Sequence, residues 1–373
     1  MKKFTFLILF FITSANADHK PPHYAYDAVS GGHSVFVEKV EAHPDSEKIN
    51  KFEESDPETS KLMDDMISGF FSKSLAGIVI DKNKIIYEKY KRGDVVNPYP
   101  AWSVTKSITS LMVGYALCEG YIKDLDDKAQ IYAEELKGTL WGEARISHIL
   151  KMKSGAPRQG LVDGGDYQTP NSAEFSMLTG RETIVDMFHR HTRLNGRGAP
   201  DLAWVYNTFD TLALGLIIES ATKRKFVDYY KDTVWRDIKF EHPTYWFLDK
   251  DRKPITHSHF HLSLRDAARV GMHIVKVINE PDENSCMRSY LRKAIVPHIL
   301  VKQVVGNKEL LGYGYQFWIE VSHGDTVRMS GHQGQEIMFN PRTGKVVAIF
   351  SAYGSAREKM YKSDGILKWL SAD

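Results

Sequence analysis

The sequence predicts an α+β fold, an α/β sandwich in which one antiparallel sheet is built from both chain ends and flanked by helices. Residues 76–90 have the pattern of a β-hairpin, with two apolar, mostly β-branched runs around the polar turn 81–84. Residues 313–352 alternate between strand-like runs and turns. The simplest packing joins these two regions in one sheet, with the mainly helical residues 124–256 as an insertion.

Helices are predicted where apolar residues recur at helical spacing. The expected helices are 57–71, the segment from just after Pro100 to about Gly120, 146–152, 181–191, 208–221, 262–277 with Ser263 as its cap, and 366–370. In the C-terminal region the expected strands are 313–321, 326–329, 336–339 and 345–352.

The N-terminus has the pattern of a secretory signal peptide. Lys2 and Lys3 precede the apolar run 4–12, which is followed by Ala15-Asn16-Ala17. The apolar run is too short to span a bilayer. We expect cleavage after Ala17 and export to the periplasm or beyond, with a retained N-terminal anchor as the alternative. Residues 18–60 are expected to form an irregular arm, and residues 61–373 the catalytic domain.

The charge balance argues against binding partners that are attracted by a large net charge. Removal of residues 1–17 takes away two lysines and leaves 47 basic and 47 acidic residues. A chain without net charge has no general attraction to nucleic acid or to an acidic membrane surface. No later segment is long and apolar enough for a membrane helix, so we expect no stable membrane insertion after signal cleavage.

The two cysteines leave their redox state open. Export permits a disulfide between Cys118 and Cys286. However, Cys118 lies in an apolar helical run, where a buried free thiol is equally natural, and the free thiol is the favoured interpretation.

The segment Ser103-Val104-Thr105-Lys106 is the strongest candidate for chemistry. Because proline disfavours helix in the residue before it, a helix is expected to begin after Pro100, with Ser103 at its first turn. A helix N-terminus stabilises negative charge, and Lys106 lies on the same face within reach of the serine hydroxyl. A lysine in a dry site can act as a base, so this turn can supply a nucleophile and its proton acceptor.

The alternative is that the Ser-x-x-Lys pattern occurs by chance and has no catalytic role. A second copy, Ser220-Ala221-Thr222-Lys223, follows an apolar run and precedes further basic residues. Basic residues at that position suit the negative end of a helix dipole. We interpret this second copy as structural.

Five segments together resemble the serine β-lactamases and penicillin-binding proteins, with the class C-like esterases and 6-aminohexanoate-dimer hydrolases as the nearest branch. The resemblance covers about residues 75–370, and the motifs occur in the family's order. The segments are Trp102-Ser103-Val104-Thr105-Lys106-Ser107, Ala116-Leu117-Cys118-Glu119-Gly120-Tyr121-Ile122, His148-Ile149-Leu150-Lys151-Met152-Lys153-Ser154-Gly155, Tyr206-Asn207-Thr208-Phe209-Asp210-Thr211 and Gly331-His332-Gln333-Gly334-Gln335.

The resemblance implies the β-lactamase/transpeptidase-like fold and a set of catalytic roles. Ser103 would form an acyl-enzyme, and Lys106 would accept its proton or hold Tyr206 ionised. Tyr206 would share the base role and protonate the leaving group, the alternative being a core tyrosine packed by Trp204. The backbone N–H groups of Ser103 and Gln335 would form the oxyanion hole.

The resemblance also implies substrate contacts, some at positions that depart from the family pattern. Gly334 would let the substrate lie against the strand edge, and Tyr167 resembles a substrate-facing tyrosine. Thr208 stands where the second motif usually has Asn or Ser, and His332 replaces the lysine of the third motif. A neutral histidine holds a carboxylate less well than a permanent cation, which favours an ester or simple amide over a β-lactam.

A rival site is the run His257-Ser258-His259-Phe260-His261. Alternate histidines on a strand could grip a metal ion, but position 261 lacks the acid of the His-x-His-x-Asp-His pattern. We expect these histidines to form a polar edge before the next helix, and we expect neither a metal nor a cofactor.

The sequence therefore predicts an exported serine hydrolase that acts on a small ester or amide. Two alternatives stay open. One is a DD-peptidase or β-lactamase, and the other is a catalytically silent protein of the same fold that binds peptidoglycan or a partner.

Overall fold

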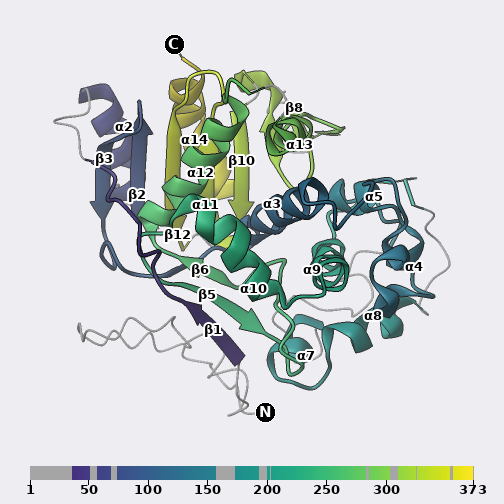
Figure 1. The fold of residues 1–373 in the computed structure, drawn as a ribbon. Coiled ribbons are helices and arrows are strands. Elements are labelled where there is room, and N and C mark those ends of the chain that lie inside the picture. Colours follow the sequence, from purple (N-terminus) through teal and green to yellow (C-terminus); the bar gives the residue numbers. More distant parts are fainter. Residues whose placement is uncertain are drawn as a thin grey trace, which may run out of the picture.

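The computed structural model describes residues 36–50, 57–68, 74–156, 173–192, 200–201, 203–282, 285–302, 310–324, 326–352 and 356–372. Within these residues the fold is α+β, as predicted. Strands and helices from both chain ends form one half of the molecule, and the helical insertion forms most of the other half (Figure 1).

The larger sheet joins the two ends of the chain. Its eight strands lie in the order β3-β2-β12-β11-β10-β9-β8-β7, and all neighbours are antiparallel. The early hairpin meets the last strand, with Ile80 opposite Val346. The strands are β2 (Ser74–Asp81), β3 (Lys84–Tyr90), β7 (Ile299–Lys302), β8 (Leu310–Tyr313), β9 (Trp318–Glu320), β10 (Thr326–Gly331), β11 (Gln335–Phe339) and β12 (Val346–Ser351). This pairing confirms the predicted sheet, although the expected strand 313–321 is broken between β8 and β9.

Helices cover both faces of this sheet because its strands carry apolar residues on both. On one face α3 (Val104–Cys118) and α12 (Leu264–Ile278) pack over residues such as Ile78 and Met329. On the other face α2 (Pro57–Ser68) and α14 (Ala356–Ser371) cover Val79 and Met338. Neighbouring residues such as Ile78 and Val79 point to opposite faces, as the strand period requires.

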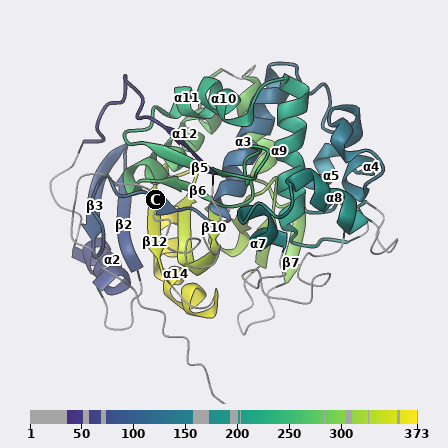
Figure 2. The ribbon, with the colours of Figure 1, turned by 90° about the horizontal axis from the view of Figure 1, so that it is seen from below.

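A second sheet was not predicted. Four short strands lie in the order β1-β5-β6-β4, which are β1 (Phe36–Val40), β4 (Tyr99–Pro100), β5 (Thr244–Leu248) and β6 (Phe260–Leu262). The segment expected to be an irregular arm therefore contains a strand, which pairs with β5 from Phe36 opposite Leu248 to Val40 opposite Thr244. Figure 2 shows β5 and β6 across the centre of the molecule, between the β2–β3 hairpin and the inserted helices.

The insertion is mainly helical, as predicted, and ends in β5. Its elements are η1 (Ala129–Ile131), η2 (Glu134–Leu136), α4 (Leu140–Glu143), α5 (Ile146–Leu150), α7 (Ala173–Leu178), α8 (Ile184–Thr192), α9 (Thr208–Thr222), α10 (Phe226–Tyr230), the π-helical η3 (Lys231–Trp235) and α11 (Arg236–Ile238). The remaining elements are α13 (Cys286–Ala294), η4 (Val321–His323) and η5 (His332–Gly334). Ser263 caps α12 by accepting a hydrogen bond from the Asp266 backbone N–H, as expected.

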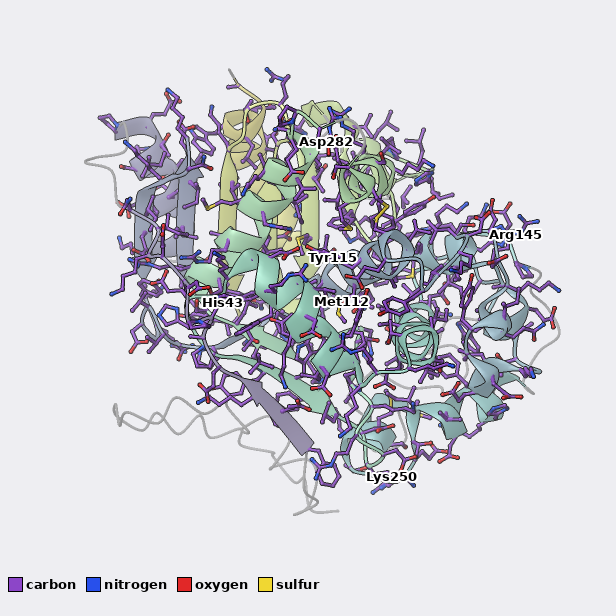
Figure 3. The ribbon with its side chains drawn as sticks, in the orientation of Figure 1. His43, Met112, Tyr115, Arg145, Lys250 and Asp282 are labelled. Carbon is purple, nitrogen blue, oxygen red and sulfur yellow. A yellow bond between two sulfur atoms is a disulfide. The ribbon has the colours of Figure 1, made fainter. Side chains whose placement is uncertain are left out.

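Cys118 and Cys286 form a disulfide with a Cα–Cα distance of 5.6 Å. The favoured interpretation of Cys118 as a free thiol is therefore wrong. The bond joins the end of α3 to the start of α13. Figure 3 draws the side chains of the described residues and labels Met112 and Tyr115 of α3. Among the described residues, no helix has both the length and the apolar character needed to cross a membrane.

Candidate active site

Ser103 lies at the N-terminus of α3, as predicted. The strand β4 ends at Pro100, and Ser103 is the residue that caps the helix. Its hydroxyl does not cap the helix backbone but accepts a hydrogen bond of 3.0 Å from Lys106 Nζ. Trp102, just before it, has a left-handed backbone with φ +48°. Such strain in a large side chain is typical of functional sites and fixes where the serine points.

Lys106 is buried against a backbone carbonyl as well as against the serine. Lys106 is 2 % exposed, and its Nζ donates a 2.8 Å hydrogen bond to the carbonyl oxygen of His257. Nζ also lies 5.3 Å from the centre of the Tyr206 ring. The His257 contact was not predicted, because every residue has a backbone carbonyl and this one lies 151 positions from Lys106 in the chain.

Tyr206 is held beside Lys106 by the end of the α5 segment. The N–H of Val205 donates to the carbonyl of Met152 at 3.0 Å, and the N–H of Asn207 donates to Met152 Sδ at 3.4 Å. These two bonds bracket Tyr206 on both sides. The resemblance predicted Tyr206 in the site, and the structure brings it to Lys106.

Aromatic side chains from the large sheet surround the Tyr206 ring. Trp318 stacks on it with ring centres 5.5 Å apart, and Tyr313 meets it edge-on at 6.1 Å. The Trp204 ring lies 6.4 Å away. The alternative for Tyr206 was a core tyrosine packed by Trp204. Trp204 does lie beside Tyr206, but both residues are partly exposed and belong to the aromatic cluster at the site.

The third motif packs directly against the segment before Ser103. A Cβ added to Gly331 would lie 2.4 Å from the carbonyl oxygen of Ala101, so glycine is required there. The rings of Trp102 and His332 are 5.5 Å apart. The structure therefore brings the first and third motifs together, as the resemblance implied.

The turn at the third motif is fixed by Gln335. Its side-chain amide donates to the carbonyls of His332 and Ser351 and accepts from the Ser351 N–H. Gln333 and Gly334 both have left-handed backbones, with φ +60° and +91°. Gln335 is fully buried, whereas His332 is exposed. The role of the Gln335 and Ser103 N–H groups as an oxyanion hole stays a prediction.

The second motif departs from the family pattern in a way that the structure explains. Asn207 is the N-cap of α9 and its side chain accepts a hydrogen bond from the Phe209 N–H. Thr208, the first helical residue, is nearly buried. Substrate contacts by Thr208, His332 and Gly334 stay predictions, and Tyr167 lies outside the described residues.

The model of the family described as beta-lactamase matches residues 64–365. The chain belongs to the beta-lactamase family. It is a serine hydrolase with the β-lactamase fold.

Similar proteins agree with this assignment. A 6-aminohexanoate-dimer hydrolase of Paenarthrobacter ureafaciens is 21% identical over 289 residues, which cover 74% of this chain and 72% of that protein. A putative 6-aminohexanoate-dimer hydrolase from Bacillus anthracis superimposes with a TM-score of 0.73 at 18% identity, covering 93% of each chain. A class C beta-lactamase superimposes with a TM-score of 0.63 at 13% identity, covering 84% of this chain and 96% of its own.

The histidine run differs from the expected polar edge. His257, His259 and His261 are all buried, just before and within β6, and the His257 carbonyl accepts from Lys106. Burial lowers the pKa of His259 to about 3, and His259 bonds to Ser258 and packs against Trp102. Within the described part of the chain, no group of three or more histidines, cysteines and acids is placed to hold a metal ion.

The second Ser-x-x-Lys copy is structural, as interpreted. Ser220 donates to the Glu135 carboxylate, and Lys223 ends α9 in a left-handed conformation with φ +56°. It therefore offers a matched control for the Ser103–Lys106 copy.

A buried carboxyl group lies under the second motif. Asp210 is 0 % exposed, and its Oδ1 accepts from Trp141 Nε1 at 2.9 Å and from Ser154 Oγ at 2.6 Å. Its Oδ2 finds no hydrogen-bond partner among the described residues. Burial raises the pKa of Asp210 to about 7. Two family motifs, at Ser154 and at the start of α9, are thus joined through one carboxyl group.

This carboxyl group predicts a pH-dependent component of stability. The folded state keeps the Asp210 proton up to about pH 7, whereas the unfolded chain releases it near pH 4, so this component is lost as pH rises from 4 through 7. The Asp210→Asn variant lacks this component. The free energy of unfolding of wild type minus that of the variant should therefore be lower at pH 8 than at pH 4, by up to about 4 kcal/mol. Urea unfolding of both proteins at the two pH values measures this difference, and parallel pH profiles would contradict it.

Proposed function

We propose that this chain cleaves a small ester or amide through a covalent acyl-enzyme on Ser103. The observation that carries the proposal is the 3.0 Å hydrogen bond from Lys106 Nζ to Ser103 Oγ. The bond lies at the start of α3, where the helix dipole favours developing negative charge. The buried amine is positioned to accept the serine proton as the hydroxyl attacks a carbonyl carbon.

The proposed reaction has two halves. In the first, Ser103 Oγ bonds to the carbonyl carbon, Lys106 with Tyr206 accepts the proton, and the N–H groups of Ser103 and Gln335 stabilise the oxyanion. The proton then passes to the leaving alcohol or amine as the carbon–heteroatom bond breaks. In the second half, water attacks the acyl carbon, the same groups take a proton from that water and deliver it to Ser103 Oγ, and the bond between Oγ and the acyl carbon breaks to release the acid. The contact of Lys106 with the Tyr206 ring supports the joint role.

The substrate class is a linear ester or amide. The relative from Paenarthrobacter ureafaciens is named a 6-aminohexanoate-dimer hydrolase, which supports an amide bond between small units. The exposed His332, in place of a lysine, provides no permanent cation for the carboxylate that a β-lactam carries.

Steady-state assays on a substrate panel test this assignment. The panel is p-nitrophenyl acetate, p-nitrophenyl butyrate, the linear 6-aminohexanoate dimer and benzylpenicillin. We expect kcat/KM for an ester or the amide to exceed that for penicillin by at least about 100-fold, and Ser103→Ala to abolish all turnover. If penicillin is instead the best substrate, the chain is a β-lactamase or a DD-peptidase.

We also propose that the protein is exported after cleavage behind Ala17. The Cys118–Cys286 disulfide supports an oxidising compartment, where such bonds form and persist. N-terminal sequencing of protein secreted by a bacterial host should begin at Asp18. An uncleaved chain that stays with the membrane fraction would favour the anchor.

A further inference from the structure

Gln316 occupies a buried turn that interrupts the aromatic segment between β8 and β9. The residue is 2 % exposed and has a left-handed backbone with φ +66°. A left-handed conformation is unfavourable for a non-glycine residue, so the surroundings must hold it in place. The turn is also where the predicted strand 313–321 breaks.

The four polar groups of Gln316 are hydrogen-bonded to three helices. Ser107 of α3 donates to the Gln316 carbonyl at 2.6 Å, and Thr211 of α9 donates to Oε1 at 2.8 Å. Nε2 donates to the carbonyls of Leu150 at 2.9 Å and Ile149 at 3.3 Å, and the backbone N–H donates to Leu150 at 3.1 Å. The Gln316 side chain therefore links α5 and α9, and its backbone carbonyl adds the link to α3.

These three elements carry the residues proposed for proton transfer. Ser107 is the neighbour of Lys106 on α3, and Thr211 lies in the helix that begins just after Tyr206. Leu150 leads into Met152, whose carbonyl and sulfur bracket Tyr206. Gln316 is thus hydrogen-bonded to elements that carry or adjoin Lys106 and Tyr206.

The strands on either side of the same turn contact Tyr206 directly. Tyr313 precedes the turn, Trp318 follows it, and both rings pack on the Tyr206 ring. A change in the turn would therefore reach Tyr206 through its aromatic neighbours as well as through α5.

We propose that Gln316 is a positioning residue that fixes Tyr206 relative to Lys106 and so sets the reactivity of Ser103. The inference rests on the proposed acyl-enzyme function. Gln316 touches neither substrate nor reacting atoms, and it acts through the three elements that it joins.

Labelling of Ser103 by a fluorophosphonate probe, followed as a rate across pH, tests this role. Gln316→Leu removes the side-chain hydrogen bonds at similar volume and should slow labelling about 30- to 100-fold, because small misplacements of reacting groups have effects of this size. The midpoint of its pH profile should also move, because the proposed proton acceptor Lys106 Nζ lies 5.3 Å from the centre of the Tyr206 ring and a shift of that ring changes its surroundings. Thr211→Val removes one of the bonds and should slow labelling by about 3- to 10-fold.

Tyr290→Phe is the matched control for lost stability. The Tyr290 hydroxyl is buried and bonds to the side chain and carbonyl of Ser110, one turn beyond Ser107 on α3. This variant also loses buried hydrogen bonds to the nucleophile helix, but it leaves the links to α5 and α9 intact. Its labelling rate should stay within about threefold of wild type, with the same pH midpoint.

Gln316→Glu adds a test of rescue. A protonated glutamic acid can donate to the Leu150 carbonyl and accept from Thr211, whereas the carboxylate cannot donate. Its labelling rate relative to wild type should therefore rise as the pH is lowered. A thermal midpoint below wild type, with an unchanged labelling rate and pH midpoint in Gln316→Leu and Thr211→Val, would overturn the inference. Failure of wild-type Ser103 to label would overturn the proposed function and this inference with it.

Discussion

Lys106→Ala should lower kcat/KM for ester hydrolysis by at least about 1,000-fold, since the nucleophile and its proton acceptor act as a unit. The Lys106 amine donates hydrogen bonds to Ser103 Oγ and to the His257 carbonyl, and it lies beside the Tyr206 ring. Without the amine, the serine hydroxyl keeps its proton at neutral pH.

The second Ser-x-x-Lys copy provides the control for this prediction. Lys223→Ala changes the same residue type at the same spacing from a serine, but at the end of α9. Its kcat/KM should stay within about threefold of wild type. Substantial turnover by Lys106→Ala, with circular dichroism showing a folded protein, would remove Lys106 from the mechanism.

Removing the disulfide should produce the largest loss of stability of any change proposed for this chain. The bond closes a loop between residues 168 positions apart, and the chain-entropy argument gives a loss of about 5 kcal/mol for a loop of this size. The double variant Cys118→Ala, Cys286→Ala should show this loss in urea unfolding. Its kcat should change little, because the bond lies at the far end of α3 from Ser103.

Reduction supplies an independent check on the same bond. Dithiothreitol should lower the stability of wild type to near that of the double variant and leave the double variant unchanged. Equal stability of oxidised and reduced wild type would show that the bond contributes nothing, and the prediction would be wrong.

The sequence predicted the centre of the large sheet, where the strands are long and apolar, and missed the four-residue strand β7 at its edge. The hairpin 76–90 and the strand 345–352 carry clear strand patterns, and both lie in the predicted sheet. The second sheet was missed because β4 and β6 have two and three residues, too few to show a period. β1 and β5 pair across about 200 residues, and no local pattern reports such a pairing.

The site was predicted where side-chain identity carries the chemistry, and missed where the backbone does. Ser103, Lys106 and Tyr206 were named from motifs, and the structure brings them together. The His257 carbonyl and the Gln316 turn were not, because a backbone acceptor and a left-handed turn leave no mark in residue type. The disulfide was missed for a related reason, since sequence spacing gives no Cα–Cα distance.

The position of the covalent adduct tests the central claim most directly. The mature protein would be treated with a fluorophosphonate probe and the labelled peptide identified by mass spectrometry, with Ser103→Ala and Ser220→Ala alongside. We expect the label on Ser103 in wild type and in Ser220→Ala, and no label in Ser103→Ala. Label on another serine, or no label in a folded wild-type sample, would contradict catalysis through Ser103.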